Sequence, residues 1–388
     1  MQLPENVLTC IRLLEENGHR AHVVGGCVRD FCLGKEPHDF DMTTDATPDE
    51  MREVFRGYRT VDTGIKHGTL TVLAGGEPLE ITTWRVDGEY ADHRHPQNVV
   101  FTKSLTEDLK RRDFTVNAMC YSPSEGLIDE FGGREDLAAG IIRAVGEPER
   151  RFEEDALRIL RALRFASVLG FSVEKATADA LREKKQLLGS VSAERIFSEW
   201  KKLLCGNSAS RILSEFADVI EVFLPEADAA RFPSLPENGD FLLRSLYLFA
   251  GVERAPERYL AACDRLRTDN ETKRRGIGVL SHLTDSLSLS KTEILHILFE
   301  IEKDDTELLL DLRAALGKGK GEKEILQTVL AERIPYRIAD LAVGGKDLTQ
   351  RGIRGKEIGE TLKDLLFAVM DGEVPNEKEK LLAGIARK

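Results

Sequence analysis

The hydrophobic pattern of the chain changes near Pro148, and this change limits the folds that are available to it. Before residue 145, runs typical of strands alternate with helical runs; the former include HRAHVVGG, HDFDMTT, GTLTVLAG and PLEITTW, the latter CVRDFCLG and PDEMREVF. From Pro148 onward apolar residues recur at spacings of three and four, as in RFEEDALRILRALRFASVLG and SAERIFSEWKKLL, with no convincing strand. The sequence therefore predicts an α+β protein with a small mixed sheet in its N-terminal part and an all-helical remainder.

The length of 388 residues allows roughly two to four domains. The change of pattern marks a first boundary, and the glycine- and lysine-rich stretch at 317–323 is typical of a loop near the last one. We expect an N-terminal part at 1–145 that holds the sheet, followed by helical parts on either side of a boundary near residue 330.

Composition limits the partners and the compartment of the protein. The net charge of −12 implies that any contact with nucleic acid comes from local basic patches. The six cysteines form no Cys-x-x-Cys pair, which favours reduced thiols over disulfides or a zinc site. No stretch approaches the ~18 apolar residues of a membrane span, and the N-terminal residues do not resemble a signal peptide. We therefore expect a cytoplasmic protein that does not contact a membrane.

The segment VVGGCVRD places a glycine turn between a predicted strand and a predicted helix. Gly25 and Gly26 have no Cβ to block a phosphate from the backbone N–H groups, and Arg29 could reach the same anion. An ordinary strand–turn–helix, in which the glycines only make the turn, is the other interpretation of this segment.

The segment HDFDM has two carboxylates at alternate positions. In a strand, Asp39 and Asp41 would project from one face while Phe40 turns into the core. A pair of Mg²⁺ ions, the arrangement used for in-line nucleotidyl transfer, would relieve their repulsion. Glu80, in the strand-like run PLEITTW, is the best candidate for a third acid. A solvated strand edge with scattered acids is the alternative.

Four segments follow one another along the chain in the order GGCVRD, HDFD, RRDFTVNAM and EDALRILRALR. In this combination the chain resembles the class II CCA-adding enzymes (tRNA nucleotidyltransferases) and bacterial poly(A) polymerases, which belong to the polymerase β-like nucleotidyltransferase superfamily. The resemblance covers about residues 20–205 and continues more weakly beyond. It implies a catalytic head at 1–145, a neck that recognises the nucleotide at 146–205, a body at 206–330 and a tail that contacts tRNA at 331–388.

The resemblance also implies roles for single residues. Asp39 and Asp41 would be the metal ligands, and Glu80 the third catalytic carboxylate. The residues that would contact the nucleotide are Gly26, Arg29 and Arg112 at the triphosphate, Asp113 and Asn117 at the ribose, and Asp155, Arg158, Arg161 and Arg164 near the base or the RNA. Guanidinium groups offer paired donors to phosphate oxygens, whereas Asp and Asn suit hydroxyl groups. Standing alone, Arg111 and Arg112 would equally suit a solvated helix end.

The segment EDALR resembles the family motif that reads the incoming base. Cytosine and adenine both present an amino donor beside a ring-nitrogen acceptor, so an Asp–Arg pair favours them over guanine and uracil. Asp155 and Arg158, three residues apart on one predicted helix, would share a face. The alternative is an ion pair between Glu154 and Arg158 at the surface, which would contribute only ~0.3–0.5 kcal/mol.

Three further segments resemble parts of the same family. The stretch 85–101 resembles the flexible loop of full CCA-adding members; we interpret its Asp92, His93, Arg94 and His95 as polar loop residues rather than metal ligands. In SAERIFSEWKKLL, Ser192 can cap a helix, and Glu194 and Arg195 can brace the neck. The stretch 343–359 resembles a tail that contacts the tRNA elbow, although it would equally serve to join two helices; its basic residues are Lys346, Arg351, Arg354 and Lys356.

Together these features predict an enzyme that adds C and A to the 3′ end of tRNA from CTP and ATP, with Mg²⁺ as cofactor and no role for DNA. An enzyme that adds only CC or only A remains an alternative, as does a poly(A) polymerase. The few histidines after His95, which are His282 and His296, cannot build a His-Asp phosphohydrolase domain.

Overall fold

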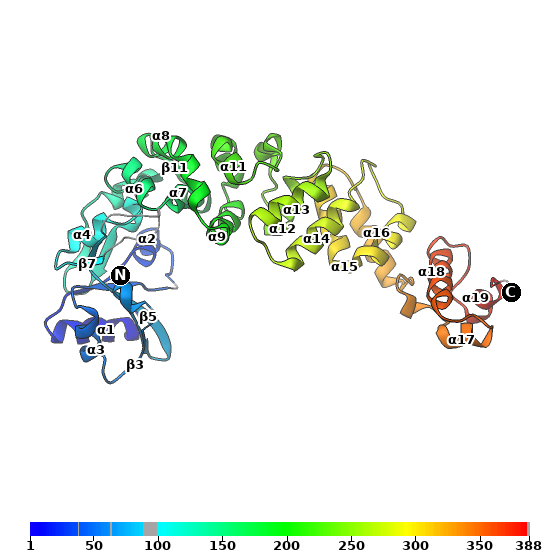
Figure 1. The fold of residues 1–388 in the computed structure, drawn as a ribbon, viewed down its shortest axis with the longest axis horizontal. Helices are drawn as coiled ribbons and strands as arrows, with labels where there is room; N and C mark the ends of the chain where they lie inside the picture. Colours follow the sequence, from blue (N-terminus) through cyan, green and yellow to red (C-terminus); the bar gives the residue numbers. More distant parts are fainter. Residues whose placement is uncertain (38, 63, 88–98, 386–388) are drawn as a thin grey trace. The chain divides into compact units, whose positions relative to one another are not determined.

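The computed structural model describes residues 1–37, 39–62, 64–87 and 99–385. The chain divides into two compact units, Met1–Pro225 and Glu226–Lys388. A sheet lies at the N-terminal end of the first unit, and helices make up most of the rest of the chain (Figure 1). This arrangement confirms the predicted α+β class.

The main sheet has seven strands in the order β3-β4-β5-β2-β1-β8-β9. Only β2 and β5 pair in parallel, and the other neighbours are antiparallel, so the sheet is mixed as predicted. A separate antiparallel pair is formed by β6 and β7. The strands are β1 (Ala21–Val24), β2 (Met42–Thr44), β3 (Arg59–Val61), β4 (Thr69–Ala74), β5 (Glu77–Thr83), β6 (Arg85–Asp87), β7 (Val99–Phe101), β8 (Met119–Ser122) and β9 (Gly126–Asp129).

Short helices pack against this sheet. In α1 the buried residues Val7, Cys10, Ile11 and Leu14 follow the spacing of one helix face, which explains why the helix docks on the sheet. A capping box between Thr47 and Glu50 begins α3. The helices of this region are α1 (Glu5–Glu16), α2 (Gly26–Cys32), α3 (Pro48–Val54), α4 (Leu105–Lys110) and α5 (Gly133–Ala139), with 3-10 turns η1 (Ile65–His67) and η2 (Thr115–Asn117).

The remainder of the first unit is helical apart from one short pair of strands. The two-residue strand β11 (Ser172–Val173) pairs in parallel with β10 (Ile141–Ile142), so the prediction of no strand after Pro148 is wrong at this point. Helix α7 packs against α9, and both helices bury apolar residues. The elements are α6 (Pro148–Glu154), α7 (Leu157–Leu169), α8 (Lys175–Glu183), η3 (Lys185–Ser190), α9 (Ala193–Leu204), α10 (Ala209–Glu215) and α11 (Ala217–Phe223).

Two local predictions for this region need correction. The segment 151–170 is not one helix, because the backbone of Asp155 is extended (φ −140°, ψ 103°) and separates α6 from α7. Ser192 occupies the N-cap position of α9, but its side chain makes no capping hydrogen bond.

The described residues of the second unit contain helices and no strand. They are η4 (Ala229–Ser234), α12 (Phe241–Tyr247), α13 (Ala255–Arg265), α14 (Asn270–Ser281), α15 (Lys291–Ala315), α16 (Glu322–Ala331), η5 (Ile338–Asp340), α17 (Gly345–Gln350), α18 (Lys356–Met370) and α19 (Lys378–Ala383). Helix α15 is kinked at Glu302, where φ is 64°. The basic stretch around Arg354 joins α17 to α18. None of the described helices is both long and apolar enough to cross a membrane.

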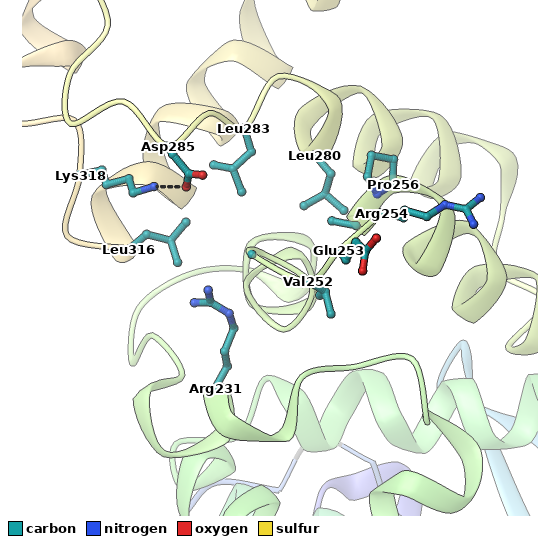
Figure 2. Close-up of a pocket in the computed structure, with 12 residues that line it drawn as sticks. Arg231, Val252, Glu253, Arg254, Pro256, Leu280, Leu283, Asp285, Leu316 and Lys318 are labelled. Carbon is teal, nitrogen blue, oxygen red and sulfur yellow. Dashed lines mark hydrogen bonds and ion pairs between the residues drawn. The ribbon is translucent and has the colours of Figure 1, made fainter.

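Two charged features stand out in the second unit. Arg313 and Glu322 form a salt bridge of 2.8 Å and are 0% and 1% exposed, so each charge depends on the other. A cavity of about 580 Å³ lies elsewhere in the unit, with the guanidinium group of Arg231 turned toward it and Lys318 paired with Asp285 at 3.0 Å on its wall (Figure 2). The finer division into body and tail at residues 330 and 331 stays a prediction.

Candidate nucleotide-binding and active site

Two cavities in the first unit share Asp41. The larger, of about 630 Å³, is lined by Asp39, Asp41, Glu77 and Glu80 together with Asn6 and apolar residues. The smaller, of about 460 Å³, is lined by Gly25, Gly26, Arg29, Asp41, Arg111, Arg112, Asp113, Asn117, Asp155, Arg158, Arg161, Arg164 and Phe165. The first cavity is therefore acidic, and the second is rich in arginine.

The acidic pair lies just before a strand rather than within one. Strand β2 begins at Met42, so the predicted strand position of Asp39 and Asp41 is wrong. The backbone still approaches β1, because the carbonyl oxygen of Asp41 accepts a hydrogen bond from Val24 N–H at 2.9 Å. Met42 pairs with Ile81 in the parallel register of β2 and β5, so Glu80 lies level with Asp41 on the neighbouring strand.

The electrostatics of the pair favour a bound cation. Burial raises the pKa of Asp41, Arg112 lowers it, and the nearby Asp39 raises it further, with a net upward shift. The Asp41 side chain is nevertheless exposed at the two cavities. Among the described residues, no group of three His, Cys, Asp or Glu side chains lies close enough to hold a metal ion. Asp39 and Asp41 line the cavity as neighbouring carboxylates, and Glu80 lines the same cavity, although the three do not form one close cluster.

The glycine turn between β1 and α2 brings the backbone close to an arginine. Gly25 has φ 79° and ψ −126°, a conformation that side-chain-bearing residues rarely adopt. A Cβ on Gly25 would lie 3.4 Å from Nη1 of Arg112. The Nε atom of Arg112 is buried and has no hydrogen-bond partner among the described residues. The turn thus places Arg112 beside the backbone of Gly25 at the smaller cavity, with an Nε–H group that is free to donate a hydrogen bond.

Asp113 and Asn117 belong to a continuous hydrogen-bonded chain. Arg29 Nη1 donates to Asn117 Oδ1 at 2.8 Å, and Asn117 Nδ2 donates to Asp113 Oδ1 at 3.2 Å. Arg161 donates to Asp113 Oδ2 from Nε and Nη2, at 2.9 and 2.6 Å. Burial opposes ionisation of Asp113, but Arg161 and Asn117 outweigh it and lower the pKa of Asp113 to about 2. Asp113 is therefore a buried carboxylate that is fixed from two sides.

The EDALR segment lines the cavity in a different way from the prediction. Asp155 lies between α6 and α7, where its Oδ1 accepts from Leu157 N–H at 3.1 Å and its Oδ2 from Arg195 Nη2 at 2.8 Å. Asp155 and Arg158 therefore do not share one continuous helix face, because the aspartate is used to begin α7. Both side chains still line the same cavity.

The alternative ion pair of the sequence is also present. Glu154 accepts from Arg158 Nη1 at 2.8 Å, and the two side chains are 13% and 11% exposed. The pair is thus mostly buried and not at the open surface. Arg158 Nη2 donates to the backbone oxygen of Arg111 at 3.0 Å, which ties α7 to the RRDF segment.

Two residues at the site, Phe165 and Glu199, were not found from the sequence. Phe165 lies under the guanidinium group of Arg164, whose Cζ is 3.7 Å from the ring centroid. Helical spacing from Arg158 and Arg161 could have indicated Phe165, since it follows them on one face. Glu199 of α9 pairs with Arg164 at 2.5 Å, and no local pattern in the sequence predicts that contact.

The structure gathers the predicted residues in two places. All nine predicted nucleotide-binding residues line the smaller cavity, Asp39 and Glu80 line the larger one, and Asp41 lines both. Asp92, His93, Arg94 and His95 lie outside the described residues, so the interpretation of that loop stays a prediction.

The sequence matches three family models. They are the poly A polymerase head domain over residues 21–143, the RNA and SrmB-binding site of polymerase A over 170–231, and tRNA nucleotidyltransferase domain 2 over 246–385. The fold is similar to the crystal structure of the Bacillus stearothermophilus CCA-adding enzyme in complex with CTP. The TM-score is 0.80 at 33% sequence identity, over 99% of this chain and 97% of that one.

Two curated relatives extend over nearly the whole chain. The CCA-adding enzyme of Lactobacillus delbrueckii subsp. bulgaricus is 36% identical over 388 residues, covering 96% of this chain and 95% of that protein. The CCA-adding enzyme of Ligilactobacillus salivarius is 36% identical over 391 residues, covering 97% of this chain and 95% of that protein. The predicted family is therefore confirmed: the chain belongs to the CCA-adding enzymes.

Proposed function

We propose that this protein adds C, C and A to the 3′ end of tRNA, using CTP and ATP and releasing pyrophosphate. One observation carries the proposal: the nine residues expected to bind a nucleotide line one cavity. Asp41, a member of the acidic pair, lines that cavity as well as the acidic one. The relatives are named for CCA addition over nearly their whole length, so addition of CC or A alone and poly(A) synthesis are not favoured.

The family of nucleotidyltransferases implies a divalent metal ion. We propose Mg²⁺, held by Asp39 and Asp41 with Glu80 nearby, because the donor set consists only of carboxylate oxygens. Burial, and to a smaller extent the neighbouring Asp39, raises the pKa of Asp41, and a cation held between the two aspartates would offset both effects. When bound, Mg²⁺ would activate the 3′-hydroxyl and neutralise charge on the triphosphate.

The side chains of the smaller cavity would orient the nucleotide. Gly26, Arg29 and Arg112 would hold the triphosphate, since guanidinium groups pair well with phosphate oxygens. Asp113 and Asn117 would accept from and donate to the ribose hydroxyls. Fixing the nucleotide in this way places its α-phosphate for attack and lowers the entropic cost of the reaction.

Asp155 and Arg158 would select the base. The carboxylate accepts from the amino group of cytosine or adenine, and the guanidinium donates to the neighbouring ring nitrogen. Arg161 and Arg164, on the same face of α7, would extend this contact toward the nucleotide or the RNA. A protein surface would then replace a nucleic-acid template.

The other predicted parts keep their proposed roles. We propose a neck at 146–205, a body at 206–330, and a tail at 331–388 that contacts the tRNA elbow through Lys346, Arg351, Arg354 and Lys356. All six cysteines are free thiols, which supports a cytoplasmic location.

The test is the addition of nucleotides to tRNA transcripts that end before the CCA, after C and after CC. Each transcript is incubated with CTP, ATP, UTP or GTP alone and with CTP and ATP together, and the product ends are sequenced. We expect CCA with both nucleotides and a halt after CC with CTP alone. A long A tail on unstructured RNA, or a halt after CC with both nucleotides present, would overturn the proposal.

A further inference from the structure

Asp108 is a fully buried carboxylate in α4 that accepts hydrogen bonds from four residues. Its Oδ1 accepts from Arg111 Nε and Nη2, at 2.9 and 2.7 Å, and from Arg85 N–H at 3.3 Å. Its Oδ2 accepts from Thr43 Oγ1 at 3.2 Å and from Arg112 Nη2 at 3.5 Å. A carboxylate can be buried to this extent only where cations and donors replace its hydration.

These donors come from segments that border the proposed site. Thr43 lies in β2, two residues after Asp41, and Arg85 is the first residue of β6. Arg112 lies against Gly25 at the wall of the smaller cavity. Asp108 therefore ties the strand that follows the acidic pair to the arginine proposed to bind the triphosphate.

A second connection leads from Asp108 to the base-reading side. Asp108 fixes the side chain of Arg111, and the backbone oxygen of Arg111 accepts from Arg158 Nη2 at 3.0 Å. The single carboxylate of Asp108 thus pairs with two neighbouring arginines, Arg111 and Arg112. Without it, two partly buried guanidinium groups would lose the carboxylate that they share.

We propose that Asp108 is a positioning residue for nucleotidyl transfer, which holds Arg112 and, through Arg111, Arg158 in register with Asp41. This inference rests on the proposed function. Asp108 is not among the described residues that line the two cavities, so it acts through the side chains it holds. Its loss should weaken nucleotide binding and base choice more than it affects the binding of tRNA.

The test is the variant Asp108→Asn, whose amide keeps the shape but loses the charge and one acceptor. We expect KM for CTP and for ATP to rise about tenfold, since a hydrogen bond to a charged group contributes about that factor. We also expect kcat and the KM for tRNA to change less than about threefold, and misincorporation of UTP to increase.

Glu322→Gln is the matched control, because Glu322 is as deeply buried and also holds an arginine, but in the second unit. Both variants should lower the melting temperature, and only Asp108→Asn should raise KM for the nucleotides. A lower melting temperature with an unchanged nucleotide KM in Asp108→Asn would overturn the inference, because a purely structural role predicts that result.

Thr43→Val is a second variant that keeps the carboxylate and removes one hydrogen bond to it. We expect a smaller rise in nucleotide KM, roughly two- to fivefold, with near-normal folding. If Asp108→Asn does not fold, an unchanged nucleotide KM in Thr43→Val overturns the inference. Failure of the proposed function is seen separately, because the unmodified protein would then not add CCA.

Discussion

Most arginines of the smaller cavity are held by acids or amides of the protein itself. Arg161 pairs with Asp113, Arg164 with Glu199, and Arg29 with Asn117. Such pairing fixes the guanidinium groups in advance, so that less conformational entropy is lost when a nucleotide binds. At the scale of single residues, charge placement therefore decides both stability and binding.

The acidic pair gives the first prediction at this scale. Asp41→Ala should lower incorporation of both CTP and ATP by at least about a hundredfold, because a carboxylate that contacts a catalytic metal stabilises the transition state directly. Single-turnover incorporation and the melting temperature are measured together. Glu77→Gln, on the wall of the same cavity, is the control and should retain most activity. Substantial activity in folded Asp41→Ala would argue against the metal role.

Asp113 gives a prediction for pH dependence. Its pKa is about 2 in the folded protein and 3.8 in the reference state, so its ionisation stabilises the fold above pH 3.8, and this contribution is lost as pH falls toward 2. Roughly 2 kcal/mol should separate the parent from Asp113→Asn at pH 7, and about half of that near pH 3. Urea unfolding at several pH values measures the difference. Asp49→Asn, at an exposed position of α3, is the control; a difference that does not change between pH 5 and pH 3 would contradict the prediction.

At the scale of secondary structure, the ends of short elements place the functional groups. The turn from β1 into α2 carries Gly25 and Gly26, and the break between α6 and α7 carries Asp155. Element ends suit this purpose because their backbone directions differ from those of a regular helix or strand.

The glycine turn predicts a contrast between two neighbouring substitutions. Gly25→Ala should destabilise the fold by about 1–3 kcal/mol, since φ is 79°, a backbone conformation that L side chains rarely adopt. Because Gly25 lies beside Arg112, the variant should also raise KM for both nucleotides. Gly26→Ala should destabilise the fold less than Gly25→Ala, because a Cβ at position 26 would meet only Arg29, at an ordinary contact distance of 3.8 Å. Chemical denaturation and steady-state kinetics compare the two. Equal effects would contradict the importance of the turn conformation.

The break before α7 predicts a change in base selection. Asp155→Ala should raise incorporation of UTP relative to CTP about tenfold or more, since one good base contact discriminates by about 1–3 kcal/mol. Arg195→Ala should have a weaker effect in the same direction, because Arg195 holds Asp155 Oδ2 at 2.8 Å. Competition assays with mixed nucleotides measure the ratio. Lys202→Ala, exposed on the same helix α9, should change nothing; unchanged discrimination in Asp155→Ala would refute the base-reading role.

At the scale of the whole molecule, the chain consists of two compact units. The proposed nucleotide site lies entirely in the first, and the buried Arg313–Glu322 pair lies in the second. Nucleotide binding to the first unit and a substitution in the second are therefore expected to affect different unfolding transitions.

This division predicts two thermal transitions in calorimetry. CTP with Mg²⁺ should raise the midpoint temperature of the first unit's transition only, because a ligand that binds the folded state stabilises it. Glu322→Gln should lower the midpoint temperature of the second unit's transition only, because it leaves the buried charge of Arg313 without its carboxylate. A single transition that both changes shift equally would show that the two units unfold as one.

Much of the fold and of the candidate site was predictable from local patterns. Alternating and helical periodicities predicted a mixed sheet followed by helices, since they report the geometry of the local backbone. The resemblance to a known family implied nine nucleotide-binding residues, which the structure then collects in one cavity. Their donor and acceptor types suit phosphate, ribose and base.

The tertiary structure alone decided which distant groups meet. Thr43 and Asp108 are 65 residues apart, Asp113 and Arg161 are 48 apart, and Asp155 and Arg195 are 40 apart. Periodicity has no information on such contacts, since they depend on how whole elements pack. The sequence by itself determined the kinds of elements and the chemistry of their residues. Packing determined which charges distant in the chain were paired and which were buried, because those contacts depend on how whole elements meet.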